Sequence, residues 1–146
     1  MERYAFVRAN FLEVNESTKE ICFISFDGKD SIINLFGKIL YKDQSEFDDI
    51  LGLIKKFDSD RKEFISNKEY DPLLEYKKYK NKDKDKAIDL ASLGLEIINK
   101  FTEAKDNNLA VVKFTKNEPN SINDPADFLF KSWAWLTSVK KIFETL

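Results

Sequence analysis

The stretch Glu20-Ile21-Cys22-Phe23-Ile24-Ser25-Phe26 decides the fold, because it is apolar on both faces of an extended strand. A short run of this kind is typical of a central strand that is covered on both sides. Such a strand needs a partner, and residues 4–14 are rich in aromatic and β-branched side chains. The polar residues 15–18 can form the turn between them. We therefore predict an N-terminal hairpin, although residues 4, 7, 11 and 14 also fit a helical stripe.

Beyond this hairpin, apolar periodicity predicts mostly helices. Residues 58–86 are the least regular part, with short apolar anchors in a charged stretch. The prediction is a single globular domain, residues 1–146, of the α+β class: a small, mostly antiparallel sheet packed with about four helices and ending in a long C-terminal helix. The expected further elements are helices over 32–40, from Ser45 to 57, from Asp85 to 105 and from Pro125 to about 145, and a strand over 109–114.

Three glycines, Gly37, Gly52 and Gly94, fall inside these predicted helices. A glycine in a helix interior costs about 1 kcal/mol relative to alanine. Close packing between helices is the simplest reason to keep them.

The chain contains no histidine and one cysteine, Cys22. Catalytic arrangements that need histidine are therefore excluded, and so are zinc sites built on histidine or on several cysteines. The glycines match no phosphate-binding loop, and no acidic stretch completes a calcium loop. We therefore predict no catalytic residue, no metal site and no cofactor, and we expect Cys22 to act as a small buried hydrophobe.

The net charge of −2 argues against nucleic-acid binding, which needs a positive face. A lysine-rich run at residues 77–86 is diluted by aspartates and is interpreted as a solvated segment. No stretch approaches the roughly 20 apolar residues that span a bilayer, so we expect no membrane contact. The first residues show no signal peptide, and a cytoplasmic location is expected.

The predicted C-terminal helix carries more aromatic surface than one buried stripe requires. One stripe includes Phe130 and Trp133, and a second, displaced stripe includes Phe128, Trp135 and Ile142. Two interpretations stay open. The helix can be central and covered on both sides by its own domain, or it can present one face to a partner, where aromatic side chains are enriched. The predicted apolar contact comprises Trp133, Trp135, Phe128 and Ile142.

Acidic residues cluster in three places that follow the start of the helix at Ser45, within residues 46–49, 58–63 and 69–75. Such a surface could steer association with a basic partner, although it is also compatible with an ordinary charged surface. The predicted charged contact comprises Asp48, Asp49, Asp58 and Asp60.

These features favour a small non-catalytic binding protein that occludes a macromolecular partner, such as a toxin-immunity or nuclease-inhibitor type protein. Its partner would be a protein, with a basic enzyme or toxin as the concrete version. The alternative is an assembly protein that forms a homo-oligomer through the C-terminal helix, because Phe128, Trp135 and Ile142 are spaced by seven. An enzyme that uses carboxylates or lysine ranks last.

Overall fold

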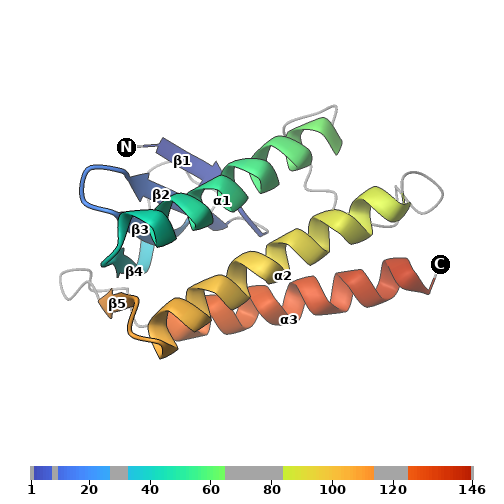
Figure 1. Ribbon diagram of the computed structural model, residues 1–146. Helices are drawn as coiled ribbons and strands as arrows, with labels where there is room; N and C mark the ends of the chain where they lie inside the picture. Colours follow the sequence, from blue (N-terminus) through green and yellow to red (C-terminus); the bar gives the residue numbers. More distant parts are fainter. Residues whose placement is uncertain (1, 8–9, 27–32, 65–83, 114–124, 146) are drawn as a thin grey trace.

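The computed structural model describes residues 2–7, 10–26, 33–64, 84–113 and 125–145, which form a sheet with helices on one face (Figure 1). The sheet has five antiparallel strands in the order β1-β2-β3-β4-β5. The α+β prediction is confirmed, but the described residues contain three helices rather than about four. The elements are β1 (Glu2–Ala5), β2 (Asn10–Asn15), β3 (Glu20–Phe26), β4 (Ile33–Tyr41), α1 (Gln44–Phe64), α2 (Lys84–Asp106), β5 (Ala110–Lys113) and α3 (Pro125–Glu144).

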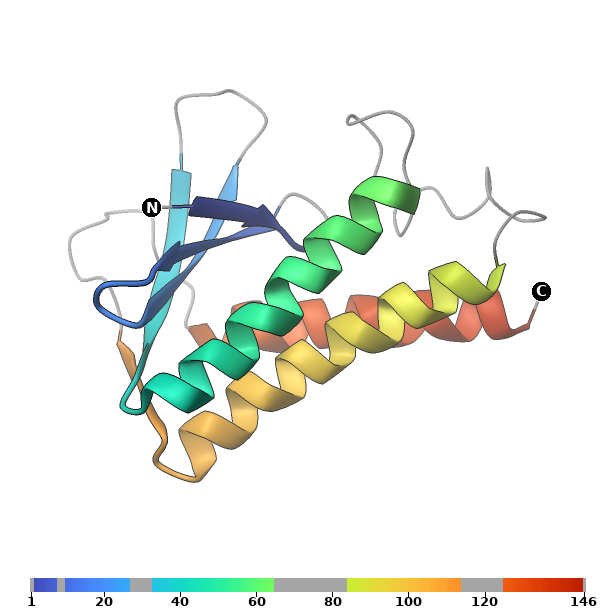
Figure 2. The same cartoon turned by 45° about the horizontal axis from the view of Figure 1, so that its top comes forward.

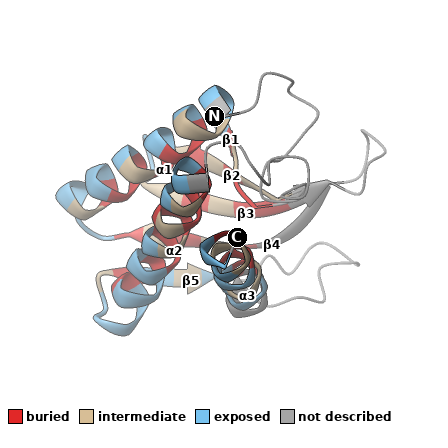
Figure 3. Cartoon of the chain, turned by 90° about the vertical axis from the view of Figure 1, so that its right-hand side faces the viewer, coloured by how far each residue is buried: buried red, intermediate tan, exposed pale blue. Residues whose placement is uncertain are grey.

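The strand predicted from Glu20 to Phe26 is β3, and it is the middle strand of the sheet. Its inward side chains align across the sheet, with Ile21 opposite Val14 of β2 and opposite Ile39 of β4. All three are buried in one core with the apolar stripes of the helices. The helices lie side by side against this face (Figure 2), and their buried sides turn towards the sheet (Figure 3).

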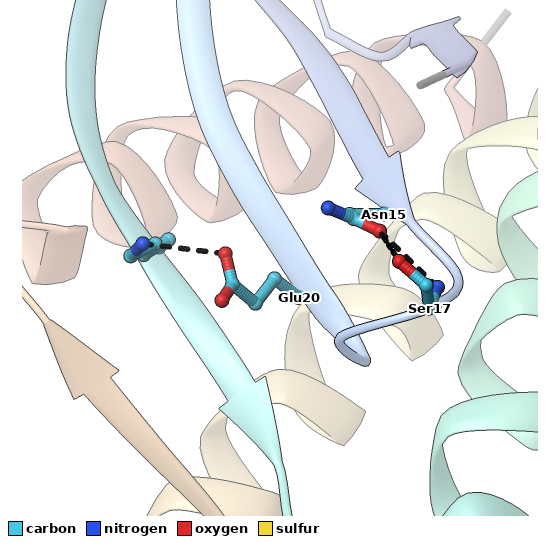
Figure 4. Close-up of polar contacts among 4 residues, drawn as sticks. Asn15, Ser17 and Glu20 are labelled. Atoms are coloured by element: carbon cyan, nitrogen blue, oxygen red, sulfur yellow. Dashed lines mark hydrogen bonds and ion pairs between the residues drawn. The ribbon is translucent and has the colours of Figure 1, made fainter.

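The turn between β2 and β3 forms where the polar cluster predicts it. The Asn15 side-chain oxygen accepts hydrogen bonds from the backbone amide of Ser17 at 3.1 Å and from its hydroxyl at 2.7 Å (Figure 4). Lys19 closes the turn with a φ of 58°. Beyond the turn, Glu20 pairs with Lys38 of β4 at 3.2 Å. The hairpin register is therefore held by polar contacts at the turn as well as by the core.

Two expectations about the first forty residues need correction. Residues 4–5 and 10–14 are extended, but they belong to two strands, β1 and β2, which pair with each other. The helix predicted over 32–40 is wrong, because this segment is β4 and fills the second edge of β3. Its apolar residues are too few to distinguish a buried strand from a helix by spacing alone.

Gly37 lies at a β-bulge in β4. Phe23 of β3 lies opposite Gly37, but Ile24 lies opposite Leu35, so β4 carries one extra residue at this point. The φ of Gly37 is 142°, in a region that side-chain-bearing residues rarely adopt. Glycine is therefore kept here for a β-bulge and not for helix packing.

The helices after β4 follow the predicted pattern with different ends. The cap of α1 is Asp43: its carboxylate accepts a hydrogen bond from the Ser45 amide at 3.1 Å, and its carbonyl accepts one from the Phe47 amide at 3.1 Å. α1 continues to Phe64, so residues 58–64 are helical rather than irregular. The lysine-rich run lies outside the described residues apart from its last three positions.

Gly94 of α2 is the point where the three helices meet. A Cβ atom placed on Gly94 would lie 2.9 Å from both Leu136 methyl groups of α3 and 3.1 Å from the Phe57 ring of α1. Close packing therefore explains this glycine, as predicted. It does not explain Gly52 of α1, which is exposed and has no atom within 4 Å of the position of a Cβ.

Candidate functional site

The buried face of α3 is one stripe with alternating spacings of three and four residues. This spacing keeps one face of a helix against its neighbours along its whole length. Leu136 reaches Gly94 of α2, so the stripe packs directly on that helix. The buried residues are Leu129, Ser132, Leu136, Val139 and Phe143.

Phe130 and Trp133 lie outside this stripe and form the most conspicuous feature of the described surface. Phe130 is 65% exposed and Trp133 is 43% exposed. Their rings stack, with centroids 6.1 Å apart and planes 29° apart. Among the described large apolar side chains, the other exposed one is Val111, on β5. Scattered apolar residues are normal on a surface, but an adjacent stacked aromatic pair is a feature of binding sites.

The other predicted contact residues of α3 are placed differently. Trp135 and Ile142 are half-buried, and Trp135 packs against the core. The Phe128 side chain lies outside the described residues. The predicted apolar contact is therefore split: Trp133 is open to a partner, whereas Trp135 belongs largely to its own domain. Phe130, which the predicted contact did not include, is the more exposed ring of the pair.

The exposed ridge that contains this pair continues towards the C-terminal end of α3. Phe130, Trp133, Thr137 and Lys141 are all exposed and lie within a narrow arc of the helix. We call these four residues the outer face of α3. Lys140 borders the ridge and forms a long ion pair of 3.9 Å with Glu144. The outer face is therefore aromatic at its N-terminal end and carries Lys141 at its C-terminal end, beside the ion pair of Lys140 and Glu144.

The four predicted acidic contact residues all lie on α1, but they are not equivalent. Asp58 is only 7% exposed, and its carboxylate lies 2.8 Å from the Lys62 ammonium. Asp60 lies 2.6 Å from Lys56. Asp48 and Asp49 are exposed, and Asp48 accepts a hydrogen bond of 2.9 Å from Gln44.

The structure does not combine the acidic and aromatic residues into one surface. The acidic residues lie on α1 and the aromatic pair lies on α3, and α2 packs between these two helices (Figures 1 and 3). Phe57 of α1 and Leu136 of α3, which are both buried, come together at Gly94. A partner that contacts the aromatic pair therefore does so on α3, whereas a partner that contacts Asp48 and Asp49 does so on α1, with α2 between the two helices.

A shallow cavity of about 250 Å³ lies at the edge of the sheet and is lined by Glu2, Tyr4, Val14, Asn15 and Glu16. The Tyr4 hydroxyl donates a hydrogen bond to Glu2, and the pKa of Tyr4 is raised by burial and by this bond. Glu2 is exposed, and Glu16 is exposed and lies 3.9 Å from Lys55. Neither carboxylate has the desolvated setting of a general acid.

A second cavity of about 240 Å³ lies between α1 and α2 and is lined by charged residues of both signs, Lys56, Asp60, Glu63, Lys86 and Asp89, with Leu90. Two of these, Lys56 and Asp60, neutralise each other at 2.6 Å. Cys22 is half-buried on the sheet, and burial raises the pKa of its thiol, which disfavours the reactive thiolate. The described side chains contain no group of acidic or cysteine residues arranged to hold a metal ion.

Within the described part of the chain, no helix is both long and apolar enough to cross a membrane. Comparison of the chain with protein-family models, with curated proteins and with solved structures gave no match. The outer face of α3 is therefore the candidate functional site.

Proposed function

We propose that this chain is a small non-catalytic binding protein that occludes a protein partner, of the toxin-immunity or nuclease-inhibitor type, and that the outer face of α3 is its apolar contact. The observation that carries the proposal is the exposed stack of Phe130 and Trp133. Phe and Trp bury large areas at a small entropic cost, and Trp is among the commonest energetic centres of protein interfaces.

The exposed area of Phe130 and Trp133 limits the binding free energy that the pair can contribute. An aromatic side chain buries about 200 Å², so exposed fractions of 65% and 43% leave roughly 200 Å² of ring surface in water. Burying that area is worth about 5 kcal/mol at 25 cal/mol per Å². Association itself costs at least about 4 kcal/mol, so the pair can be the centre of an interface but needs a surrounding contact. Thr137 and Lys141 extend the contact along the same ridge.

The charged half of the proposal rests on Asp48 and Asp49. These two carboxylates are exposed at the N-terminal part of α1, whereas Asp58 is buried against Lys62 and Asp60 is paired with Lys56. A basic partner would approach α1 under their attraction, which would raise the association rate more than the affinity. A partner large enough to reach both α1 and α3 would use both surfaces.

The test is affinity capture from a lysate of the organism that encodes the chain, with the wild type and three variants in parallel. We expect a protein captured by the wild type at near-equal amounts to be lost with the double variant F130S/W133S. The matched control is V111S, which removes from β5 an apolar residue about as exposed as Trp133. The third variant, D48K/D49K, should retain the captured protein but reduce the salt dependence of its association rate.

Two results would count against the proposal. Capture of the same protein by the wild type and by F130S/W133S would remove the aromatic pair from the contact. An association rate that D48K/D49K leaves unchanged at every salt concentration would remove the electrostatic half. Both rings are exposed, so circular dichroism of F130S/W133S should match that of the wild type and show that lost capture is not lost folding.

A further inference from the structure

We infer that, when no other protein occupies it, the outer face of α3 joins two copies of this chain, in a two-fold pair whose α3 helices run antiparallel to each other. The inference goes beyond the proposed function, because the occupant of the surface is a second copy and not a foreign protein. It depends on three observations: the open position of α3, the spacing of its exposed residues, and the way charge is distributed along the ridge.

α3 lies at one side of the helical layer, with α2 as its helical neighbour (Figure 3). The buried stripe that contains Leu136 faces α2, while Phe130, Thr137 and Lys141 face away from it. A second helix can therefore lie along the outer face without displacing any described element. Two-fold symmetry is the commonest symmetry of protein dimers, and in a two-fold pair both copies use the same ridge.

The spacing of the ridge suits a helix–helix contact. Phe130, Ala134, Thr137 and Lys141 follow one another at intervals of four, three and four residues, which is the spacing of a coiled-coil seam. The two central positions are small, so two helix axes can approach closely there. An axis of symmetry midway between Ala134 and Thr137 places each of these small residues across from the other in the second copy.

The distribution of charged and aromatic residues along the ridge favours an antiparallel pair, and it favours a second copy of this chain as the partner. With the axis at that point, Phe130 lies opposite Lys141 of the second copy, and Trp133 lies near Lys140 of the second copy. Each aromatic ring thereby meets an ammonium group, which its face attracts. A parallel pair would instead place lysine against lysine. The aromatic end and the basic end of one ridge are thus complementary to each other.

The first test is the mass of the full chain in solution, by sedimentation equilibrium over a wide range of concentrations. We expect a reversible rise from the monomer mass towards twice that value. The variant F130S/W133S should raise the dimer dissociation constant by about tenfold or more, and K141E should also raise it. V111S should leave it unchanged. A chain that stays monomeric up to about 1 mM, or a dimer that F130S/W133S leaves intact, overturns the inference.

The second test measures direction and register by cross-linking with a short bismaleimide of about 8 Å, in a C22S background that contains no other thiol. In the antiparallel pair the two copies of residue 137 are about 7 Å apart between Cα atoms, whereas the two copies of residue 141 are about 17 Å apart. We expect T137C to cross-link efficiently and K141C to remain uncoupled. Equal cross-linking of both variants would indicate a parallel pair and contradict the inference.

These outcomes are separate from those of the capture experiment. A monomeric chain that captures a protein through Phe130 and Trp133 would support the proposed function and overturn the two-fold contact. A dimer that meets both tests and captures nothing would support the two-fold contact and oppose the proposed function.

Discussion

Replacing glycine by alanine should have opposite effects on the stability of the protein at the two helical glycines, Gly52 and Gly94. Replacing glycine by alanine in a helix interior is worth about 0.5–1 kcal/mol, mainly because the unfolded chain loses freedom. G52A should give this full gain, because no atom lies within 4 Å of the new methyl group. In G94A the same gain is opposed, because the methyl group would lie 2.9 Å from both Leu136 methyl groups and 3.1 Å from the Phe57 ring.

The size of the opposing effect follows from the surroundings of Gly94. Leu136 is 0% exposed and Phe57 is 1% exposed, so neither side chain can move into water. Extra volume in such a core costs about 1–3 kcal/mol. We therefore expect G94A to be less stable than the wild type by about 1 kcal/mol, and less stable than G52A by about 1–3 kcal/mol.

The assay is urea unfolding followed by circular dichroism, together with thermal unfolding, where 1 kcal/mol corresponds to about 4 °C in a chain of this size. A double-mutant cycle with L136V provides the mechanism, because shortening Leu136 should reduce the cost of G94A. If G94A were as stabilising as G52A, the close packing of the three helices at this point would be refuted.

Three further substitutions test other features. G37A should destabilise the protein by about 1–3 kcal/mol in urea unfolding, because its φ of 142° is strained for alanine; an unchanged midpoint would contradict the bulge. S132A should be more stabilising than S138A by about 1 kcal/mol, because the Ser132 hydroxyl is buried with no hydrogen-bond partner among the described residues, whereas Ser138 is exposed. Equal effects on the free energy of unfolding would mean that the Ser132 hydroxyl has a hydrogen-bond partner. Burial raises the pKa of Tyr41 and, with the bond to Glu2, that of Tyr4 above the ordinary 10.0, so the folded state holds these protons more tightly. The stability that these protonated tyrosines contribute should therefore be fully present below about pH 10 and should fall as the pH rises further, less steeply in Y41F than in the wild type. The same pH dependence of the urea midpoint in both proteins would contradict this role of Tyr41.

The helices could be predicted from the sequence where their amphipathic pattern is long. α2 and α3 appear within one or two residues of their expected ends, and β5 lies inside its predicted stretch. The helix prediction over 32–40 failed, because the pattern of this segment suits a buried strand as well as a helix, and residues 33–41 form β4. What decides between them is the vacant edge of β3, which is a property of the whole sheet and not of the segment.

The candidate site was predicted only in part, for a similar reason. An excess of aromatic surface on α3 is visible in the sequence, but which rings are exposed depends on where α2 and the sheet lie around the helix. The buried stripe of α3 passes through Ser132, and this orientation of the helix leaves Phe130 in water and places Trp135 against the core. Likewise, Asp58 and Lys62 have the spacing of a helical ion pair, but the segment was predicted to be irregular, and the burial of Asp58 depends on packing against other elements.

The strand order has a consequence for the order in which the protein is assembled during synthesis. β1 to β4 pair with their neighbours in the chain, so the first 41 residues can form four strands by local contacts. β5 joins β4 only after α1 and α2 have been made, with Lys113 opposite Lys38. Until then Leu12, Phe23 and Ile39 have no complete helical layer to cover them. A nascent chain halted in this interval would present an uncovered apolar sheet, and that species is where chaperone binding or aggregation should concentrate.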